Sequence, residues 1–453
     1  MLVVMIPTFH STSRVLSAGR AQRFRHHVAS AADVADCHRI LRTAPADLTL
    51  LPFGAGQSLG DSCLNDGGGL ILTSKMTQVL RADETKGLIV AEPGLTMGQL
   101  AEVSLSWSDG KSWFPAVLPG STAVTIGGAI ANDVHGKNHP SQGSFCHHVE
   151  ALTLMKSDGD IITCDERDNV DLFHATLGGL GLTGIIVSAT LRLRTCSGPL
   201  LESEDLRCES LAEALSLFFE SGKEWEYRFY WLDTFDPVGR GVFTRSRHCA
   251  GQLREAEPQS LTMRAIARLP LPATIGGPML WRTWYKILLS GTPRRRLRRT
   301  THRHALAPLG EFPYWNRLLG PRGLLHQQSV FPIGEAPMLL DALLADCRDM
   351  GEPPCLASIK LFGSRRPVGL LSFPREGFTI ALDFANRGET TRRLLRRLEA
   401  RVLEAGGAIY PAKDSTLSPE GFRRSFPAWE SFVPHIDSHF SSSFWRRVFG
   451  IQQ

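Results

Sequence analysis

Glycine-rich turns between short apolar strands constrain this chain more than any other feature. They read PFGAGQSLGDS (52 to 62), LPGSTAVTIGGAIANDVHGKNH (118 to 139) and LGGLGLTGII (177 to 186). Without a Cβ the backbone can approach a ligand closely, and successive N–H groups can point together at an anion. Three such surfaces predict a groove for an extended ligand such as a dinucleotide. Neither the G-K-[ST] ending of a Walker loop nor a Rossmann fingerprint accompanies them.

The pattern of predicted elements changes at about residue 200. Before it, short strands alternate with turns, as in the predicted hairpin ALTLMKSDGDIIT (151 to 163). After it, EYRFYWLD, LLHQQSVFP, LASIKLFG and GFTIALDF alternate with period two between helix-like stretches, which is typical of an antiparallel sheet flanked by helices. A chain of 453 residues is long for one core. We therefore predict a two-domain α+β fold, with domains at 1–196 and 197–405 and a C-terminal segment at 406–453 that returns to the first domain.

Composition narrows the class of protein. Hydrophobic residues make up 43% of the chain, yet no apolar run is long enough for a spanning helix. The first residues lack the features of a secretory signal, and the nine cysteines contain no C-x-x-C pair. We expect a cytoplasmic protein with reduced thiols. The net charge of +5 is too small to indicate a nucleic-acid partner.

The stretch 251–305 combines Pro, Gly and aromatic residues with an arginine run, PRRRLRRTTHRH (293 to 304). It is predicted to form a mobile flap. The arginines form either a solvated loop or a contact with phosphate, from a substrate or from a membrane. Trp281, Trp284 and Tyr285 could enter a headgroup zone, so we predict peripheral contact through residues 270–300 with the inner face of a membrane.

The order of the motifs adds a family resemblance. GAGQSLGD, AEPGLTMGQL, PGSTAVTIGGAIANDVHGKNHPSQGSF and LFHATLGGLGLTGIIVSATLRL resemble, in register, the PCMH-type FAD-binding domain of the vanillyl-alcohol oxidase superfamily. The later segments YWLDTFDPVGRGVFTR, IKLFG, LLSFPREGFTIALDF and IYPAKDS are similar, in the same order, to segments of its polyprenyl-phosphate pentose oxidases, which combine this domain with a substrate (cap) domain. The resemblance covers nearly the whole chain and implies FAD as the cofactor.

The resemblance also assigns the cofactor contacts residue by residue. Some superfamily members link flavin covalently to a His in the first turn; Gln57 stands there, and an amide cannot form that link, so we expect non-covalent FAD. The implied cofactor set is Phe53, Gly54, Ala55, Gly56, Gln57, Ser58, Leu59, Gly60, Asp61, Gly120, Thr125, Ile126, Gly127, Gly128, Asn132, Asp133, Val134, His135, Ile185, Ile186 and Tyr410.

Oxidation of an alcohol requires that the hydroxyl proton be removed or stabilised by a positioned group. Lys413 in YPAKDS is the first candidate, because a Lys in a partly dry site can titrate in the working range; His135 and Lys137 complete the catalytic set. The implied substrate contacts are Lys137, Gln328, Lys360, Thr379, Asp383 and Lys413. Asp383 could instead satisfy backbone donors in the sheet. Ala381 stands where related enzymes have Cys, and His326 also departs from the family pattern, so the sugar stays open.

The predicted activity is FAD-dependent oxidation of the 2′-hydroxyl of a polyprenyl-phosphate-linked pentose, of the decaprenylphosphoryl-ribose type, as the first half of an epimerisation. The resemblance implies a short-chain keto-reductase to complete it and a quinone-like electron acceptor. Two alternatives remain: an oxidase of a free alditol or aldonolactone, and a non-catalytic protein that binds FAD or lipid phosphate.

The segment HGKNH raises a separate question, because His135 and His139 stand four residues apart with Lys137 between them. Such a pair can bind zinc when it lies on a helix. Gly136, Asn138 and Pro140 make a helix unexpected here. We therefore predict no metal site.

Overall fold

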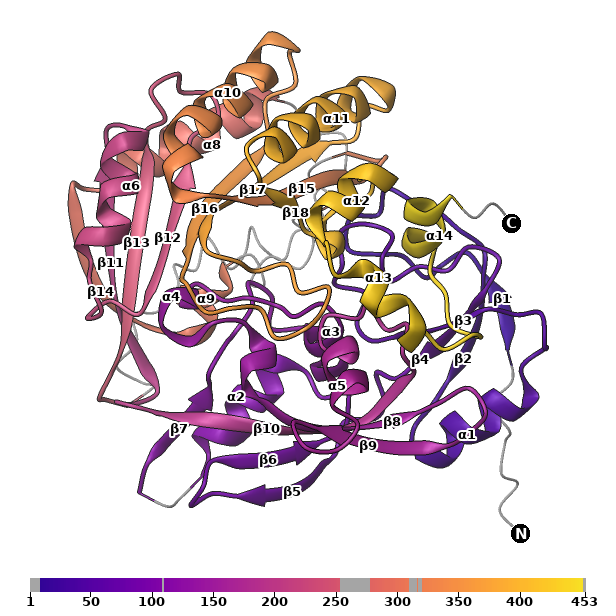
Figure 1. Ribbon diagram of the computed structural model, residues 1–453. Helices are drawn as coiled ribbons and strands as arrows, with labels where there is room; N and C mark the ends of the chain where they lie inside the picture. Colours follow the sequence, from indigo (N-terminus) through magenta and orange to yellow (C-terminus); the bar gives the residue numbers. More distant parts are fainter. Residues whose placement is uncertain (1–8, 108–109, 253–277, 309–315, 317–319, 451–453) are drawn as a thin grey trace.

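Three β-sheets organise the chain, and a C-terminal segment connects them (Figure 1). The computed structural model describes residues 9–107, 110–252, 278–308, 316 and 320–450. Helices and sheets both contribute, which confirms the α+β class. The two smaller sheets lie together in the lower half of Figure 1, and the largest sheet, with its covering helices, lies above them.

The first sheet has four strands in the order β1 (His10–Thr12), β2 (His26–Ser30), β4 (Gly69–Leu72) and β3 (Leu50–Phe53). Strands β2, β4 and β3 run parallel, and α1 (Val34–Thr43) makes the crossover from β2 to β3. The carboxylate of Asp33 caps α1 by accepting from the Asp36 N–H at 2.7 Å, and Cys37, Ile40 and Leu41 bury its inner face. Strand β3 ends at Phe53, where the first glycine-rich turn begins.

The second sheet carries the other two glycine-rich turns. Its strand order is β5 (Val79–Asp83), β6 (Leu88–Ala91), β10 (Ile185–Cys196), β8 (Val149–Met155) and β9 (Ile161–Asp165), and β7 (Ser112–Pro115) pairs with the far end of β10. Strands β8 and β9 form the predicted hairpin. The helical elements of this half are α2 (Met97–Leu105), α3 (Ile126–Ala131), α4 (His139–Gln142), η1 (Phe145–His148) and α5 (Val170–Thr176).

The third sheet has eight antiparallel strands. Their order is β14 (Arg295–Thr301), β11 (Leu200–Cys208), β13 (Gly241–Cys249), β12 (Tyr227–Leu232), β16 (Leu356–Phe362), β17 (Gly377–Ala385), β15 (Leu324–Phe331) and β18 (Ala408–Ile409). Helices α6 (Leu211–Glu220), α10 (Ala336–Asp349) and α11 (Glu389–Glu404) cover one face (Figure 1). The remaining elements of this region are α8 (Pro278–Gly291), α9 (His302–Leu306) and η5 (Ile333–Glu335).

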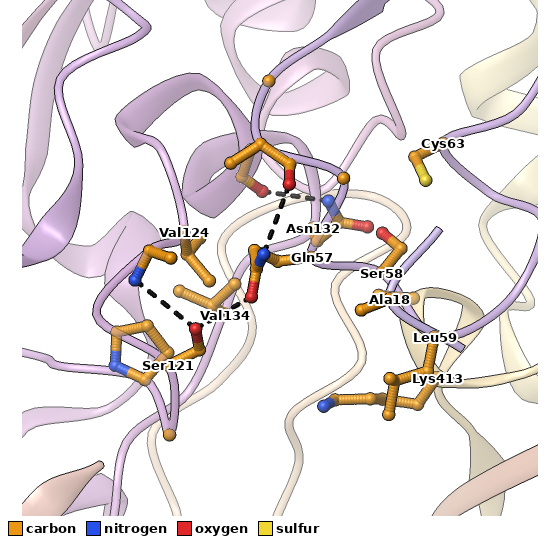
Figure 2. Close-up of a pocket in the computed structure, with 18 of the residues that line it drawn as sticks. Ala18, Gln57, Ser58, Leu59, Cys63, Ser121, Val124, Asn132, Val134 and Lys413 are labelled. Atoms are coloured by element: carbon orange, nitrogen blue, oxygen red, sulfur yellow. Dashed lines mark hydrogen bonds between the residues drawn. The ribbon is translucent and has the colours of Figure 1, made fainter. Parts of the chain in front are cut away.

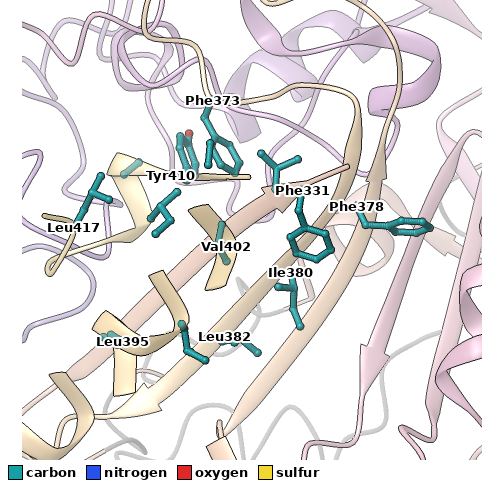
Figure 3. Close-up of a cluster of buried hydrophobic side chains, with 14 of the residues drawn as sticks. Phe331, Phe373, Phe378, Ile380, Leu382, Leu395, Val402, Tyr410 and Leu417 are labelled. Carbon is teal, nitrogen blue, oxygen red and sulfur yellow. The ribbon is translucent and has the colours of Figure 1, made fainter. Parts of the chain in front are cut away.

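Strand alternation decides what each face of this sheet presents. Ile380, Leu382 and Phe384 of β17 are buried with residues of α11 such as Leu395 in the main core (Figure 3). Each such side chain contributes about 1.5–3 kcal/mol through its removal from water. Thr379, Ala381 and Asp383 consequently point the other way, toward the glycine-rich turns. The period-two alternation predicted for GFTIALDF is thereby confirmed.

The C-terminal segment runs beside the first sheet through η6 (Pro411–Lys413), α12 (Pro419–Ser425), α13 (Trp429–Phe432), η7 (Val433–His435) and α14 (Ser443–Phe449). Its clearest link is an ion pair between the partly buried Arg447 and the buried Asp61. Arg447 of α14 binds Asp61 at 2.8 Å and lies 3.4 Å from Asp414. One guanidinium therefore joins the end of the first glycine-rich turn to the residue that follows Lys413.

Two expectations for the stretch 251–305 were wrong, and residues 253–277 lie outside the described part. The arginine run is no loop: Arg295–Thr301 forms edge strand β14, paired with β11, and Arg298 lies 3.1 Å from Asp205. Trp281 and Tyr285 lie one turn apart on α8 and are buried, so neither can enter a headgroup zone. Trp281 packs with Leu59, Leu324 and Leu356, on the face of the sheet opposite α10 and α11.

Candidate active site

A cavity of about 730 Å³ lies between the glycine-rich turns and the uncovered face of the third sheet. This volume is at the upper end for small-molecule and cofactor sites, which suits an extended ligand. Backbone and small residues of the first two sheets form one wall. Strands β15, β16 and β17, together with η6, form the other. We call these the glycine wall and the strand wall.

The glycine wall is built from tight turns held against each other. Gly56 has φ +63°, a conformation that favours glycine, and it lies at the tip of the turn after β3. Ser121 of the second turn donates to Gln57 Oε1 at 2.9 Å, and Gln57 Nε2 donates to the Ala55 carbonyl at 3.2 Å (Figure 2). Thr125 caps α3 through the Gly128 N–H. The two turns therefore present their backbones to one space.

Unpartnered polar atoms show that this wall is made for a polar ligand. Ser17 Oγ, Ser62 Oγ, Asn132 Oδ1 and His135 Nδ1 are buried without a hydrogen-bond partner in the described part of the chain, and all four residues line the cavity. A buried polar group without a partner costs about 1–3 kcal/mol. A ligand with many donors and acceptors would satisfy these atoms. FAD has that character, so the residues present fit the cofactor that the motifs predict.

Most of the predicted cofactor residues line the cavity: Gly54, Ala55, Gly56, Gln57, Ser58, Leu59, Gly120, Thr125, Gly127, Gly128, Asn132, Val134, His135, Ile186 and Tyr410. The cavity lining does not include Phe53, Gly60, Asp61, Ile126, Asp133 or Ile185. These six support the wall from behind. Asp133, for example, accepts from Ser144 Oγ at 2.9 Å and from the Cys146 N–H at 3.0 Å, and a Cβ on Gly60 would lie 1.4 Å from the Asp414 carbonyl oxygen.

The cysteines near the cavity are unsuited to a covalent flavin link. Burial raises the pKa of the Cys63 thiol, which lines the cavity, to about 12. Burial and the neighbouring Asp133 also raise the pKa of Cys146 well above its usual range. A thiol is a poor nucleophile when its thiolate is this disfavoured.

The strand wall contributes polar side chains from neighbouring strands at matching heights. Lys360 and Ser358 project from β16, Asp383 and Ala381 from β17, and His326 and Gln328 from β15, and all six line the cavity. The register pairs Ser358 with Ala381, Gln328 with Ala381 and His326 with Asp383. Lys413, on η6, reaches into the same space close to Leu59 (Figure 2).

A hydrogen-bond network joins the two walls. Gln328 Nε2 lies 2.9 Å from His135 Nε2 and donates to Thr379 Oγ1 at 3.0 Å. Thr379 is buried behind Gln328 and does not line the cavity, so its contact with a substrate would pass through Gln328. Burial, with Lys360 and His139 nearby, holds the pKa of His135 well below its usual range. His135 is thus a neutral imidazole whose Nε2 is already occupied.

Three lysines line the cavity: Lys360 and Lys413 belong to the strand wall, and Lys137 faces them from the HGKNH segment. Burial, aided by the nearby Lys413, lowers the pKa of Lys360 to about 7. Burial also lowers the pKa of Lys413, although Asp383 opposes that shift. Lys137 has a lowered pKa for the same main reason, and its Nζ donates to the Ala305 carbonyl at 2.8 Å and lies 3.5 Å from the centre of the Phe229 ring.

The sequence patterns did not predict the contact between His326 and Asp383. His326 Nδ1 lies 2.7 Å from Asp383 Oδ1, and both side chains are buried. The Asp383 carboxylate therefore binds a side chain of the neighbouring strand. It does not serve the backbone donors of the sheet, which was the alternative that the sequence left open. Alternation places each residue on the correct face, but their contact depends on the register of β15 with β17. Ser17 and Asn316 also line the cavity and belong to none of the motifs, and Ser62, at the end of the first glycine-rich turn, lines it without having been assigned a contact.

The HGKNH segment divides between the cavity and a packed interior. Contrary to expectation, a short helix is present: α4 begins at His139 with Pro140 in its first turn. His135 lies before this helix, so the two imidazoles do not share a helix face. His139 Nδ1 accepts from the Gly363 N–H at 3.1 Å. No cluster of His, Cys, Asp or Glu suited to a metal ion occurs among the described residues.

Comparison with known proteins agrees with this geometry. Residues 26–165 match the FAD binding domain family. Decaprenylphosphoryl-β-D-ribose oxidase of Mycolicibacterium smegmatis is 31% identical over 442 residues, which cover 93% of each chain. L-gulonolactone oxidase of Mus musculus is 33% identical over 192 residues, which cover 41% of this chain and 40% of that one.

These matches confirm the PCMH-type fold, FAD as the cofactor and an oxidoreductase that acts on CH–OH groups. Within the part of the chain that the structure describes, no helix combines the length and the apolar character needed to cross a bilayer.

Proposed function

Because this chain belongs to the FAD-dependent oxidoreductase family of decaprenylphosphoryl-β-D-ribose oxidase, we propose that it oxidises the 2′-hydroxyl of a polyprenyl-phosphate-linked pentose to a keto group. The observation that carries this proposal is the set of three lysines around the cavity. Lys137, Lys360 and Lys413 face one cavity, in which Asp383 is the only acidic residue of the described lining.

A phosphate-linked sugar would satisfy this arrangement. Buried amines repel one another and lose hydration, which disfavours their charged forms, as the lowered pKa values of Lys360 and Lys413 indicate. A phosphate would offset both effects through charge-assisted hydrogen bonds. Gln328 and Ser358 supply amide and hydroxyl groups for the sugar. A free alditol or aldonolactone lacks the anion, so this alternative leaves the cations without a partner.

The residues divide the work of the reaction. The glycine wall would hold FAD, which would supply a hydride acceptor for the carbon that is oxidised. Lys413 stabilises the negative charge that develops on the sugar oxygen, because a positioned cation acts strongly in a poorly hydrated site. Lys137 and Lys360 hold the phosphate, and the Gln328 amide orients His135 and the sugar. Tyr410 donates to the Asn132 carbonyl at 2.8 Å and so closes the strand wall against the glycine wall.

We further propose the partners that this chemistry needs. Oxidation leaves a keto sugar, and completion of an epimerisation needs a short-chain keto-reductase. The two electrons need an acceptor, for which a quinone-like molecule suits a substrate that resides in a membrane. The lipid chain places the enzyme at the membrane surface, and the outward face of α8 supports this contact. There Met279 is 84% exposed and Ile287 is 67% exposed, near the exposed Arg294.

Anaerobic reduction of the bound flavin tests the proposed activity. The purified flavoprotein is mixed with prenyl-phosphate pentoses, with the corresponding free pentoses and with an aldonolactone, and the visible flavin band is followed. We expect bleaching with at least one prenyl-phosphate pentose and none with the free sugar. Bleaching by the aldonolactone alone would support the alternative oxidase. Bleaching with no compound would contradict the proposed activity.

A further inference from the structure

One buried pair in the strand wall has the arrangement of a general base and its orienting carboxylate. His326 of β15 and Asp383 of β17 stand directly opposite each other in the antiparallel ladder. His326 Nδ1 lies 2.7 Å from Asp383 Oδ1, and the two side chains are only 4% and 10% exposed. Water therefore does not separate them, and the carboxylate fixes both the direction of the imidazole and the position of its proton.

The other ring nitrogen is free to react. His326 Nε2 is buried without a hydrogen-bond partner in the described part of the chain, and the residue lines the cavity. When Nδ1 carries the proton and donates it to Asp383, Nε2 carries a lone pair.

We infer that His326 is the base that removes the proton from the hydroxyl group being oxidised, and that Asp383 is its positioning residue. This inference rests on the proposed function. The O–H bond of the substrate breaks, its proton moves to His326 Nε2, and the C–O single bond becomes C=O. The hydrogen on the same carbon leaves with its electron pair to the bound FAD, so the alcohol loses two electrons in total. The new imidazolium is stabilised by the Asp383 carboxylate.

The neighbouring groups are less suited to this step. His135 Nε2 is occupied by the Gln328 amide at 2.9 Å. Lys413 can accept a proton only after it has lost one. Burial, by contrast, lowers the pKa of His326 despite the opposing effect of Asp383, and so keeps this imidazole neutral. The roles therefore separate: His326 takes the proton, and Lys413 supplies positive charge to the oxygen.

The inference predicts a pH dependence with a defined sign. The groups that act on His326 are Asp383, which raises its pKa, and Lys413 and Lys360, which lower it. Because the base works only when neutral, kcat/KM should fall as the pH drops through the pKa of His326, which lies below 6.5. Asp383→Asn removes the raising partner, so this acid limb should shift to lower pH while the rate decreases.

The test compares two buried histidines by substitution with glutamine. His326→Gln keeps a group that can bond to Asp383 but cannot take a proton, so kcat should fall about 10²–10⁴-fold and the acid limb should disappear. His26→Gln is the matched control. Its Nδ1 binds the Asn65 carbonyl at 2.8 Å, its Nε2 has no partner in the described chain, and it lies outside the cavity lining. This control should keep the wild-type rate and pH profile.

A second measurement needs no substrate. Nitrogen-15 NMR of the ring nitrogens in the FAD-loaded protein should give the Nδ1–H tautomer for His326, and Asp383→Asn should change it. A wild-type rate with an unchanged acid limb in His326→Gln, or an Nε2–H tautomer in the wild type, would overturn the inference. Failure of the proposed function has a different signature, because wild-type flavin would then remain unbleached by every prenyl-phosphate pentose.

Discussion

The two walls of the cavity recognise their ligands by different physical means. The glycine wall presents backbone N–H groups, small side chains and tight turns, and its positions are held by contacts such as Ser121 to Gln57. The strand wall presents His326, Lys360, Asp383 and Lys413 from strands and a short turn. One wall offers shape and fixed dipoles that do not titrate near neutral pH. The other offers groups whose protonation depends on burial and on each other.

This difference suggests a division of evolutionary freedom. A backbone cradle changes little when side chains change, so it suits a cofactor that every related enzyme shares. A wall of projecting side chains can alter its chemistry at one position without disturbing the ladder. The two positions at which the resemblance implied a departure from the family, His326 and Ala381, both belong to the strand wall. Substitutions in the two walls should therefore impair the protein in different ways: those in the glycine wall should reduce cofactor binding, and those in the strand wall should reduce the rate of reaction.

The largest effect is expected in the glycine wall. Gly128 lines the cavity, and a Cβ there would meet only Thr125 Oγ1, at 3.1 Å. Gly128→Leu should fold but fill the FAD groove, so the purified protein should carry almost no flavin and show no activity. Flavin absorbance per protein measures this loss. Gly334→Leu, at a glycine whose Cβ would meet nothing within 4 Å, should retain flavin. Full flavin in Gly128→Leu would contradict the placement of FAD.

The strand wall should lose its chemistry and keep its cofactor. Lys413→Ala should slow anaerobic flavin reduction by about 10²–10⁴-fold, because the cation beside the reacting oxygen is lost. Stopped-flow absorbance measures the rate. Lys156→Ala, at a half-buried lysine that is absent from the cavity lining, is the control. A non-catalytic binding protein would show no flavin reduction in either protein. An unchanged rate in Lys413→Ala would remove this residue from catalysis.

A smaller effect should follow the titration of Lys360. Burial lowers its pKa to about 7, so its charge is present below that pH and is lost as the pH rises through it. The KM for a phosphate-linked substrate should consequently increase above neutral pH, by at most about tenfold per pH unit from this one group. Lys360→Met should raise KM at every pH and remove this dependence. A flat KM profile in the wild type would exclude Lys360 as a phosphate ligand.

The smallest effect is expected outside both walls, on α8. Met279→Ser with Ile287→Ser removes two exposed apolar side chains, which should reduce binding to anionic liposomes by about threefold to tenfold. Flotation on a density gradient measures the bound fraction. Met338→Ser on α10, where the side chain is 79% exposed, is the control. If the wild type does not float, or if the double variant floats equally well, α8 is not a membrane contact.

The two walls also differ in how far the sequence predicts them. Local patterns were sufficient for the glycine wall, because glycine-rich turns indicate that the backbone can approach a ligand closely. Gly54 to Leu59 do line the cavity. Alternation in TIALDF was sufficient to orient Asp383. The His326–Asp383 contact was not predictable in this way, since it depends on the register of two strands that are 57 residues apart at this point.

In the stretch 278–301, residue type alone gives the wrong prediction. Arg295–Thr301 reads as a solvated run, yet Glu204 and Asp205 of β11 accept ion pairs from Arg295 and Arg298, and these long-range partners favour a strand. Residue type alone predicts a membrane contact for Trp281 and Tyr285. Their spacing of four residues instead indicates one buried helix face, which the structure confirms.

The ion pair of Arg447 with Asp61, and its proximity to Asp414, has a consequence for how the enzyme is made. The glycine turn that starts at residue 54 is synthesised early, but it is anchored by a helix that the ribosome adds almost 400 residues later. The Lys413 turn depends on the same guanidinium. The groove therefore lacks this anchor until α14 has been synthesised, so we expect stable FAD binding only after that point. Cellular FAD supply should then affect the yield of finished protein more than the speed of its synthesis.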